Sequence, residues 1–244
     1  MSTKISLIIP TLNRFESLKK AICSFLNLKN KPDEIIVIDQ STDVSISDKI
    51  KSYLESLDQT TTIYFYQDEP SLTIARNNGL NMASNEIIVF SDDDVIVENE
   101  VFLEIKELMT DTSISMIAGI DSNQKSSKSV FGYFAGFKSF RYRKQGHVTK
   151  SMLGRFPNKL TKKTKTMWAM GYFFAVRKSL IDKWNIRFDE NLKSYAYAED
   201  LDFSFSYFKK SKEENLECII HPSITVNHLA SKEFRVPSKK STFM

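Results

Sequence analysis

The sequence predicts an α/β fold in which a mostly parallel β-sheet is flanked by helices. The main observation is that short apolar runs alternate with helix-like segments through the first half of the chain, which is typical of parallel strands joined by crossover helices. The composition is that of a globular protein, because 41% of the 244 residues are hydrophobic and 26% are charged. A chain of this length can form one large domain with a full core and a pocket.

Five apolar runs are expected to form strands. The first is rich in β-branched residues and stops at Pro10, as expected for a strand covered on both faces. The five runs are Lys4–Ile9, Glu34–Ile38, Thr61–Tyr66, Glu86–Phe90 and Ile114–Ile120. Apolar residues recur at helical spacing in the four segments between them, 13–26, 46–57, 71–82 and 99–109. Asn13 and Ser71 are suitable N-caps for the first and third of these helices.

Polar side chains follow three of the predicted strands at the point where each strand ends. The three clusters are Thr11-Leu12-Asn13, Asp39-Gln40-Ser41 and Asp92-Asp93-Asp94. In parallel sheets of this kind, ligands bind outside the carboxyl ends of the strands. We therefore expect the three clusters to converge on one ligand site at a single edge of the sheet.

The alternation of strand and helix signals stops after Asp121. We expect a single domain over residues 1–230, followed by a basic tail over 231–244. Within the domain, a sheet half (1–121) and a second half (167–230) are separated by a basic, aromatic insert (122–166). In the second half, order returns at Met167–Val176, a helix opens near Ala198 and runs toward Lys210, and Ile219–Val226 is expected to be extended.

The net charge of +4 hides an uneven distribution. The window from Ser122 to Ile181 holds fourteen Lys or Arg residues and no Asp or Glu, which leaves 20 basic and 30 acidic residues elsewhere. A basic surface with a specific role is therefore expected. Its interleaved aromatics favour an anionic membrane as the partner. The alternatives are a solvated lysine face over an aromatic core, or nucleic acid, which would not need an adjacent acidic site. These aromatics are Phe131, Tyr133, Phe134, Phe137, Phe140, Tyr142 and Phe156.

Cysteine content and hydropathy indicate the compartment. The two cysteines, Cys23 and Cys218, are too few for a disulfide framework and lack zinc-ligand spacing. No apolar run reaches the roughly 18 residues needed to span a bilayer, and the first residues lack the pattern of a signal peptide. We expect a cytoplasmic protein, peripheral at the inner face of the membrane if the insert binds lipid.

The run Asp92-Asp93-Asp94 is the first candidate for chemistry. Three successive carboxylates repel one another unless a cation or several donors neutralise them. Oxygen ligands at positions i and i+2 suit Mg²⁺ or Mn²⁺, which also bind phosphate oxygens. The alternative is a solvated loop in which an Asp caps the next helix. The position after a buried strand, at the ligand edge, favours the metal site.

Three further groups are candidates. Glu199 and Asp200 open the last helix; they can simply favour its N-terminus, but a carboxylate beside a pocket can also act as a general base. Arg76 lies in a helix that Gly79 weakens. A surface arginine is the usual explanation, but the glycine also indicates a packing or ligand-binding role. His228 is either an ordinary core or surface histidine or a third metal ligand.

Together the motifs resemble those of family 2 glycosyltransferases with the A-type fold. The resemblance rests on five segments in order, over Ile5 to about Phe208: Leu7–Arg14, Val37–Asp43, Ala75–Gly79, Phe90–Asp94 and Ala198–Asp202. It implies a Rossmann-like domain whose 1–121 half binds a nucleoside diphosphate-sugar, most readily a UDP-sugar, and whose C-terminal half binds a glycan or lipid-linked acceptor. The reaction would be inverting transfer to an acceptor hydroxyl, in cell-surface polysaccharide or glycoconjugate synthesis, with Mn²⁺ or Mg²⁺.

The resemblance also implies roles for individual residues. On the donor side, Thr11 and Asp39 would contact the base and Arg76 would hold the nucleotide, within a binding surface that includes Pro10, Asn13, Asp92 and Asp93. Asp92 and Asp94 would bind the metal, and His228 resembles the metal ligand that some relatives place after the last strand. On the acceptor side, Gly171 and Trp168 belong to the acceptor segment, Asp200 would be the base, and Glu199 would orient the acceptor hydroxyl.

The second motif departs from the family pattern. Relatives usually have paired acids followed by Gly-Ser, whereas this chain has Asp39-Gln40-Ser41, which puts base recognition in doubt. Two rival functions remain to be compared. A nucleotidyltransferase would need a Gly-rich phosphate loop, which Pro10–Arg14 lacks. A non-catalytic sheet domain could bind nucleic acid or an anionic surface through the insert, but it would gain nothing from acids at its ligand edge.

Overall fold

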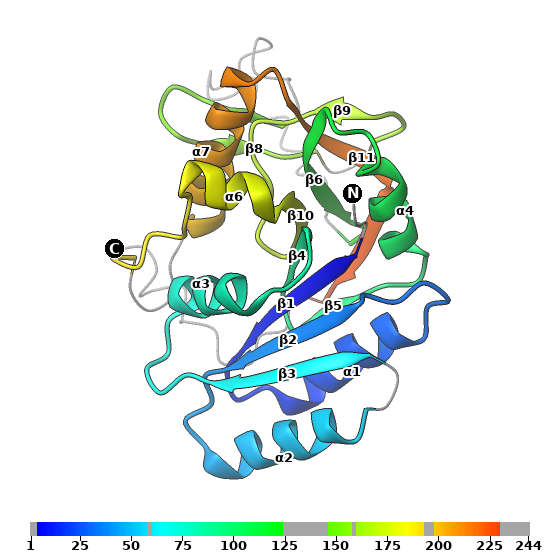
Figure 1. Ribbon diagram of the computed structural model, residues 1–244, viewed down its shortest axis with the longest axis vertical. Coiled ribbons are helices and arrows are strands. Elements are labelled where there is room, and N and C mark those ends of the chain that lie inside the picture. Colours follow the sequence, from blue (N-terminus) through cyan, green and yellow to red (C-terminus); the bar gives the residue numbers. More distant parts are fainter. Residues whose placement is uncertain (1–3, 58–59, 124–145, 158–159, 193–197, 230–244) are drawn as a thin grey trace, which may run out of the picture.

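The computed structural model describes residues 4–57, 60–123, 146–157, 160–192 and 198–229, and it confirms the predicted α/β class (Figure 1). The first half contains β1 (Ile5–Thr11), α1 (Phe15–Leu26), β2 (Glu34–Asp39), α2 (Val44–Glu55), β3 (Thr61–Tyr66), α3 (Leu72–Met82), β4 (Ile87–Ser91), β5 (Val95–Ile96), α4 (Val101–Leu108) and β6 (Ile114–Asp121). The second half contains β7 (His147–Val148), β8 (Gly154–Arg155), β9 (Thr164–Lys165), β10 (Phe173–Arg177), α6 (Lys178–Trp184), α7 (Glu199–Glu213) and β11 (Glu217–His228).

Nine strands form one sheet in the order β3-β2-β1-β4-β10-β6-β11-β5, with β9 attached to β11. The pairs β1–β2, β2–β3, β1–β4 and β6–β11 are parallel. In contrast, β10 lies antiparallel between β4 and β6. Because Thr11 and Asp39 are register partners at the ends of β1 and β2, the two strands deliver their polar loops to the same edge.

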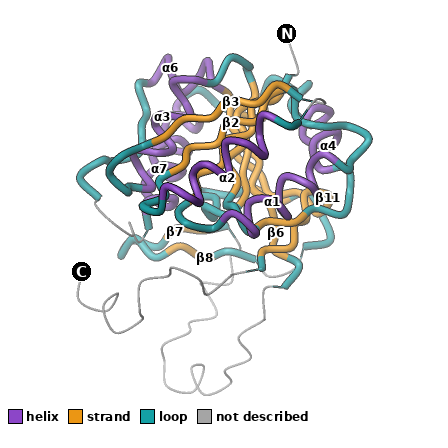
Figure 2. Tube along the Cα trace, turned by 90° about the horizontal axis from the view of Figure 1, so that it is seen from below, coloured by secondary structure: helices purple, strands orange, loops and turns teal. Residues whose placement is uncertain are grey.

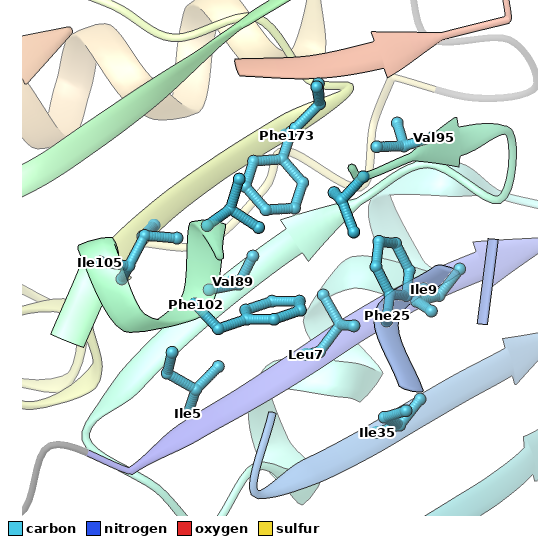
Figure 3. Packing of buried hydrophobic residues seen from close by; sticks show 14 of the residues in the cluster. Ile5, Leu7, Ile9, Phe25, Ile35, Val89, Val95, Phe102, Ile105 and Phe173 are labelled. Atoms are coloured by element: carbon cyan, nitrogen blue, oxygen red, sulfur yellow. The ribbon is translucent and has the colours of Figure 1, made fainter. Parts of the chain in front are cut away.

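Each face of the sheet carries its own apolar core. Alternate residues of a strand point to opposite faces, so Leu7 and Ile9 join one cluster and Ile8 joins the other. The first cluster packs under α1, α2 and α4 (Figure 3). The second packs under α3, α6 and α7, around the rings of Phe90, Phe174 and Phe203. A change of Phe90 to Ala would cost about 3–5 kcal/mol there.

The helix starts confirm one predicted cap and correct the other. Ser71 caps α3 by accepting a hydrogen bond from the Ile74 amide. The N-cap of α1 is Arg14, not Asn13, and Arg14 makes no side-chain cap bond. Asn13 instead adopts a positive φ of 55°, a conformation that Asn tolerates better than most residues. Its side-chain oxygen accepts a hydrogen bond from the Thr42 amide.

Several elements were not predicted. In the second half these are α6, the antiparallel placement of β10, and the two-residue strands β7, β8 and β9. In the first half, the two-residue strand β5 was missed. In the described residues, no helix is long and apolar enough to cross a membrane. Most of the aromatics of the basic insert and the whole 231–244 tail lie outside the described residues; Phe156 is described and packs edge-on against Trp168.

Candidate active site

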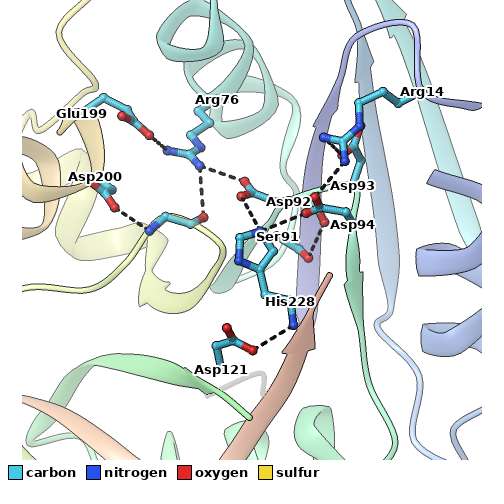
Figure 4. Close-up of polar contacts among 11 residues, drawn as sticks. Arg14, Arg76, Ser91, Asp92, Asp93, Asp94, Asp121, Glu199, Asp200 and His228 are labelled. Carbon is cyan, nitrogen blue, oxygen red and sulfur yellow. Dashed lines mark hydrogen bonds and ion pairs between the residues drawn. The ribbon is translucent and has the colours of Figure 1, made fainter. Parts of the chain in front are cut away.

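The three predicted polar clusters meet at one edge of the sheet, as expected. Figure 4 shows the aspartate run among Arg14, Arg76 and His228. The Thr11 hydroxyl donates to Asp93 Oδ2 over 2.7 Å, which joins the loop after β1 to the loop after β4. The Asn13 amide donates to Ser41 Oγ over 2.9 Å, which joins the loops after β1 and β2. Parallel register brings these loops together, and side-chain hydrogen bonds fix them.

Asp93 is the buried anchor of the aspartate run. One of its oxygens accepts from Thr11, and the other lies 2.8 Å from Arg14 Nη1. Burial raises the pKa of Asp93 to about 7, although Arg14 and Thr11 act in the opposite direction. Since both oxygens have partners within the protein, Asp93 orders the loop that presents Asp92 and Asp94.

Asp92, Asp94 and His228 form a cluster that can hold a metal ion. One ligand atom from each lies within 4.8 Å of the others. His228 Nε2 is 3.1 Å from Asp94 Oδ1 and 3.8 Å from Asp92 Oδ2. This nitrogen is buried, and the two carboxylates are its close charged neighbours. Two carboxylates and one imidazole are a donor set that fits Mn²⁺, and the carboxylates also suit Mg²⁺.

The charges around the cluster favour the ionised form of Asp94. Burial opposes ionisation, but hydrogen bonds from His228 and Arg14 lower the pKa of Asp94 well below its usual range. Burial also acts to lower the pKa of His228, yet the neighbouring Asp94 and Asp92 raise it overall. A metal would therefore compete with a proton for His228, since only the neutral imidazole is a ligand.

Arg76 joins the aspartate run after β4 to the acids that open α7. It extends from α3, is 1% exposed, and lies 3.3 Å from Asp92 and 2.8 Å from Glu199. Its Nη2 also donates to the Gly171 carbonyl over 3.0 Å. One guanidinium thus ties together the loop after β4, the segment before β10 and the start of α7. The structure therefore places Arg76 inside the site and not on the surface.

Asp200 is held by backbone donors beside this link. Its Oδ2 accepts from the Gly171 amide and its Oδ1 from the Leu201 amide, each over 2.7 Å. Burial raises the pKa of Asp200, with these hydrogen bonds and Arg76 acting against it. Burial likewise raises the pKa of Glu199 to about 7, opposed by Arg76 and reinforced by Asp200. Glu199 and Asp200 are adjacent acids of raised pKa, close to the candidate metal ligands, and such acids are suited to proton transfer.

Gly171 is required by the close approach of its neighbours. A Cβ atom at this position would lie 3.0 Å from Arg76 Nη2 and 3.1 Å from Asp200 Cβ. Any larger side chain would push these two groups apart. Trp168, the other predicted acceptor-side residue, is 7% exposed and packs its ring against Gly154. It packs with Phe156 and Leu201 in a small apolar cluster.

The remaining predicted donor residues line the same edge but have partners of their own. Asp39 is fully buried and accepts hydrogen bonds from the Ser41 amide and the Tyr64 hydroxyl, each over 2.9 Å. Pro10 lies in β1 opposite Ile38, beyond the last residue of β1 that pairs with β4. A missing backbone donor is tolerated there.

Three residues of the site were missed from the sequence. Arg14 bridges Asp93 and Asp94, with its Nη2 2.7 Å from Asp94 Oδ2. Tyr172 stacks on His228 with ring centroids 5.2 Å apart. The amide of His228 donates to Asp121 Oδ1 over 3.1 Å. Arg14 stood inside a recognised motif and could have been found, whereas Tyr172 and Asp121 act through contacts between distant segments.

The sheet, the aspartate run after β4 and the acids that open α7 together define a nucleotide-binding fold of the A-type glycosyltransferase class. The chain belongs to glycosyl transferase family 2, whose family model matches residues 6–184. It is 33% identical over 198 residues to the GalNAc(5)-diNAcBac-PP-undecaprenol beta-1,3-glucosyltransferase of Campylobacter jejuni, covering 77% of this chain and 55% of that protein. It is 25% identical over 239 residues to the poly(ribitol-phosphate) beta-N-acetylglucosaminyltransferase TarP of Staphylococcus aureus, covering 93% of this chain and 64% of that protein.

Solved structures confirm the fold. GalNAc-T7 with UDP, GalNAc and Mn²⁺ matches 92% of this chain and 43% of its own, with a TM-score of 0.67 and 17% identity. The mannosyltransferase PcManGT of Pyrobaculum calidifontis, with GDP-Man and Mn²⁺, matches 95% and 58%, with a TM-score of 0.64 and 14% identity. The chain spans 55% and 64% of the length of these two curated relatives.

Proposed function

We propose that the protein transfers a sugar, with inversion, from a nucleoside diphosphate-sugar to an acceptor hydroxyl. The observation that carries this proposal is the link through Arg76. It holds the Asp92–Asp94–His228 cluster on one side and the Glu199–Asp200 pair on the other. Inverting transfer needs these two groups: charge stabilisation at the leaving diphosphate and a separate base at the acceptor.

The residues of the site can account for the proton, the bond formed and the bond broken in this reaction. Asp200 would accept the proton of the acceptor hydroxyl as its oxygen bonds to the anomeric carbon. The bond between that carbon and the diphosphate breaks on the opposite face, which inverts the centre. A divalent cation, Mn²⁺ or Mg²⁺, bound to Asp92, Asp94 and His228 would stabilise the negative charge of the departing diphosphate. Arg76 and Gly171 would keep Asp200 in place, and Glu199 would order Arg76.

The donor and acceptor are proposed in general terms. A UDP-sugar is the preferred donor, although the departure at Asp39-Gln40-Ser41 leaves the base open to test. For the acceptor we propose a glycan or lipid-linked saccharide that carries phosphate. The acceptors named for the two curated relatives contain a diphosphate-linked undecaprenol and a ribitol phosphate. The acid-free basic window from Ser122 to Ile181 complements such charges. A lipid-linked acceptor would place the protein in the cytoplasm, at the inner face of the membrane.

The test is hydrolysis of nucleotide sugars in the presence of Mn²⁺, Mg²⁺ or a chelator. A panel that varies the base and the sugar should give one preferred donor, with hydrolysis lost on chelation. Calorimetry with the matching nucleoside diphosphate should show tighter binding with Mn²⁺. Absence of both donor hydrolysis and metal-dependent nucleotide binding would contradict the proposed function.

A further inference from the structure

The β7–β8 hairpin presents two adjacent apolar side chains to solvent. Met152 is 48% exposed and Leu153 is 56% exposed, at the tip of the turn between His147–Val148 and Gly154–Arg155. In Figure 2 the hairpin lies at the lower edge of the described chain. Among the described residues, the other large exposed apolar side chains, such as Val44, stand apart from one another in the sequence. Met152 and Leu153 therefore form an apolar pair that does not belong to the buried core.

The turn that carries the pair is ordered by its own hydrogen bonds. The Thr149 amide donates to the Leu153 carbonyl, and the Met152 amide donates to the Thr149 carbonyl, each over 3.0 Å. The Leu153 amide donates to Thr149 Oγ1 over the same distance. These bonds order the turn and leave fewer of its backbone donors to enter an apolar phase unpaired.

Positive charge surrounds the tip. Lys150 and Arg155 flank the apolar pair and are exposed. Both belong to the window of fourteen basic residues that contains no acid. Apolar side chains next to Lys and Arg, with no acid nearby in sequence, match an interface of acyl chains and anionic headgroups. A protein partner would more often bring a mixed set of charges.

The hairpin is anchored to the acceptor side of the active site. A Cβ atom on Gly154 would lie 2.4 Å from the Trp168 ring, so the ring and the hairpin backbone are in direct contact. Thr166 and Gly146 tie the two segments at their base, since Thr166 Oγ1 and the Met167 amide both donate to the Gly146 carbonyl. The same segment continues to Gly171, which holds Asp200.

We propose that the β7–β8 hairpin is a membrane-docking element that inserts Met152 and Leu153 into the interface of an anionic bilayer. This inference rests on the proposed function, because an acceptor carried on a lipid phosphate is the reason why the protein would bind a membrane. Two side chains and a few charges give weak, reversible binding that depends on anionic lipid. Docking would hold the acceptor segment, and with it Asp200, toward the lipid surface.

The experiment is sedimentation of the full chain with vesicles of phosphatidylcholine alone or of phosphatidylcholine mixed with phosphatidylglycerol. We expect recovery only with the mixed vesicles, weakened by added salt. The double variant Met152→Asn, Leu153→Ser should lower the partition coefficient about tenfold. Asn suits the positive φ of 57° at position 152. The matched control is Val44→Ser, a more exposed apolar side chain in α2, which should bind as the unchanged protein does.

A second variant measures insertion directly. Leu153→Trp should bind mixed vesicles at least as well, and brominated lipid should quench its added fluorescence. Equal binding by the double variant and the unchanged protein, or no quenching of Trp at position 153, would overturn the proposal. Binding to phosphate-rich polymer but to neither vesicle would overturn it in favour of a polyanion site. Donor hydrolysis without vesicles should be the same in the variants and the unchanged protein, and its absence from the unchanged protein would count against the proposed function and not against the hairpin.

Discussion

The two halves of the molecule hold their functional groups in different ways. In the half before Asp121, parallel register brings the polar loops to one edge, as the pairing of Thr11 with Asp39 shows, and side-chain hydrogen bonds such as that of Thr11 to Asp93 fix them there. In the half after Gly146, the acids that open α7 are held by contacts to distant segments, above all those of Asp200 to the Gly171 amide and of Glu199 to Arg76. The polar residues of the first half are thus carried by the sheet itself, whereas Glu199 and Asp200 depend on a few long-range contacts and should be easier to disable selectively.

The largest effect should come from Asp200→Asn. The change keeps the size of the side chain but removes its basicity, so transfer should fall about 10²-fold or more. Nucleoside diphosphate affinity, measured by calorimetry, should stay the same because the donor side does not depend on this group. Asp202→Asn, an exposed acid on the same helix, is the control and should leave both quantities unchanged. If Glu199→Gln abolishes transfer while Asp200→Asn does not, the two acids have exchanged roles.

A comparable test of the donor side is Asp94→Ala. Removing one carboxylate from the Asp92–Asp94–His228 cluster should abolish the gain in nucleotide affinity on adding Mn²⁺, a loss of about tenfold or more. Affinity is measured by calorimetry with and without the metal. Asp48→Ala, an exposed acid on α2, should keep the metal dependence. A metal-dependent affinity that survives in Asp94→Ala would rule out the cluster as the metal site.

The difference between the two halves also explains which elements and site residues could be predicted from the sequence. The elements of the first half follow periodic patterns with nearby turn residues, and the strand Thr61–Tyr66 was predicted with its observed bounds. The aspartate run and Asp200 were found because whole motifs are contiguous. The antiparallel entry of β10 and the stacking of Tyr172 on His228 arise only when segments distant in sequence meet. Asn13 was assigned to a cap because local propensity cannot reveal its partner Thr42 in the next loop.

Gly171→Ala should separate a catalytic effect from a packing effect. The added methyl group would lie 3.0 Å from Arg76 and 3.1 Å from Asp200, so transfer should fall about tenfold, since misplacement by a fraction of an ångström weakens an oriented base. The matched control is Gly119→Ala, whose Cβ would lie 3.0 Å from Phe173 in the core. That variant should lower the melting temperature with little change in turnover per folded molecule. Equal effects of both substitutions on turnover would contradict a positioning role for Gly171.

The pH profile tests the coupling of the two acids. Burial and the neighbouring Asp200 raise the pKa of Glu199 to about 7, and by reciprocity an ionised Glu199 raises the pKa of Asp200. An enzyme whose base has a raised pKa loses activity as the pH falls through that pKa. The acidic limb of the kcat/KM profile should therefore lie at a higher pH than the usual pKa of a carboxylate. Glu199→Gln removes the like charge and should move this limb to lower pH. An unchanged limb in Glu199→Gln would show that the two acids titrate independently.

The smallest effect concerns the two thiols, one in each half. Cys23 is exposed on α1, whereas Cys218 is 3% exposed in β11, and burial raises the pKa of its thiol to about 11. Only about one Cys218 in a thousand would be a thiolate at pH 8, so a thiol reagent should label one cysteine rapidly and the second only on unfolding. Cys23→Ser, which removes the rapid phase, makes the rate at Cys218 measurable alone. If the second half opened locally, Cys218 would react faster than global unfolding measured by circular dichroism. Equal rates would show that β11 and β6 open only with the whole sheet, and that the weakness of the acceptor side is confined to the loops that carry Gly171 and Asp200.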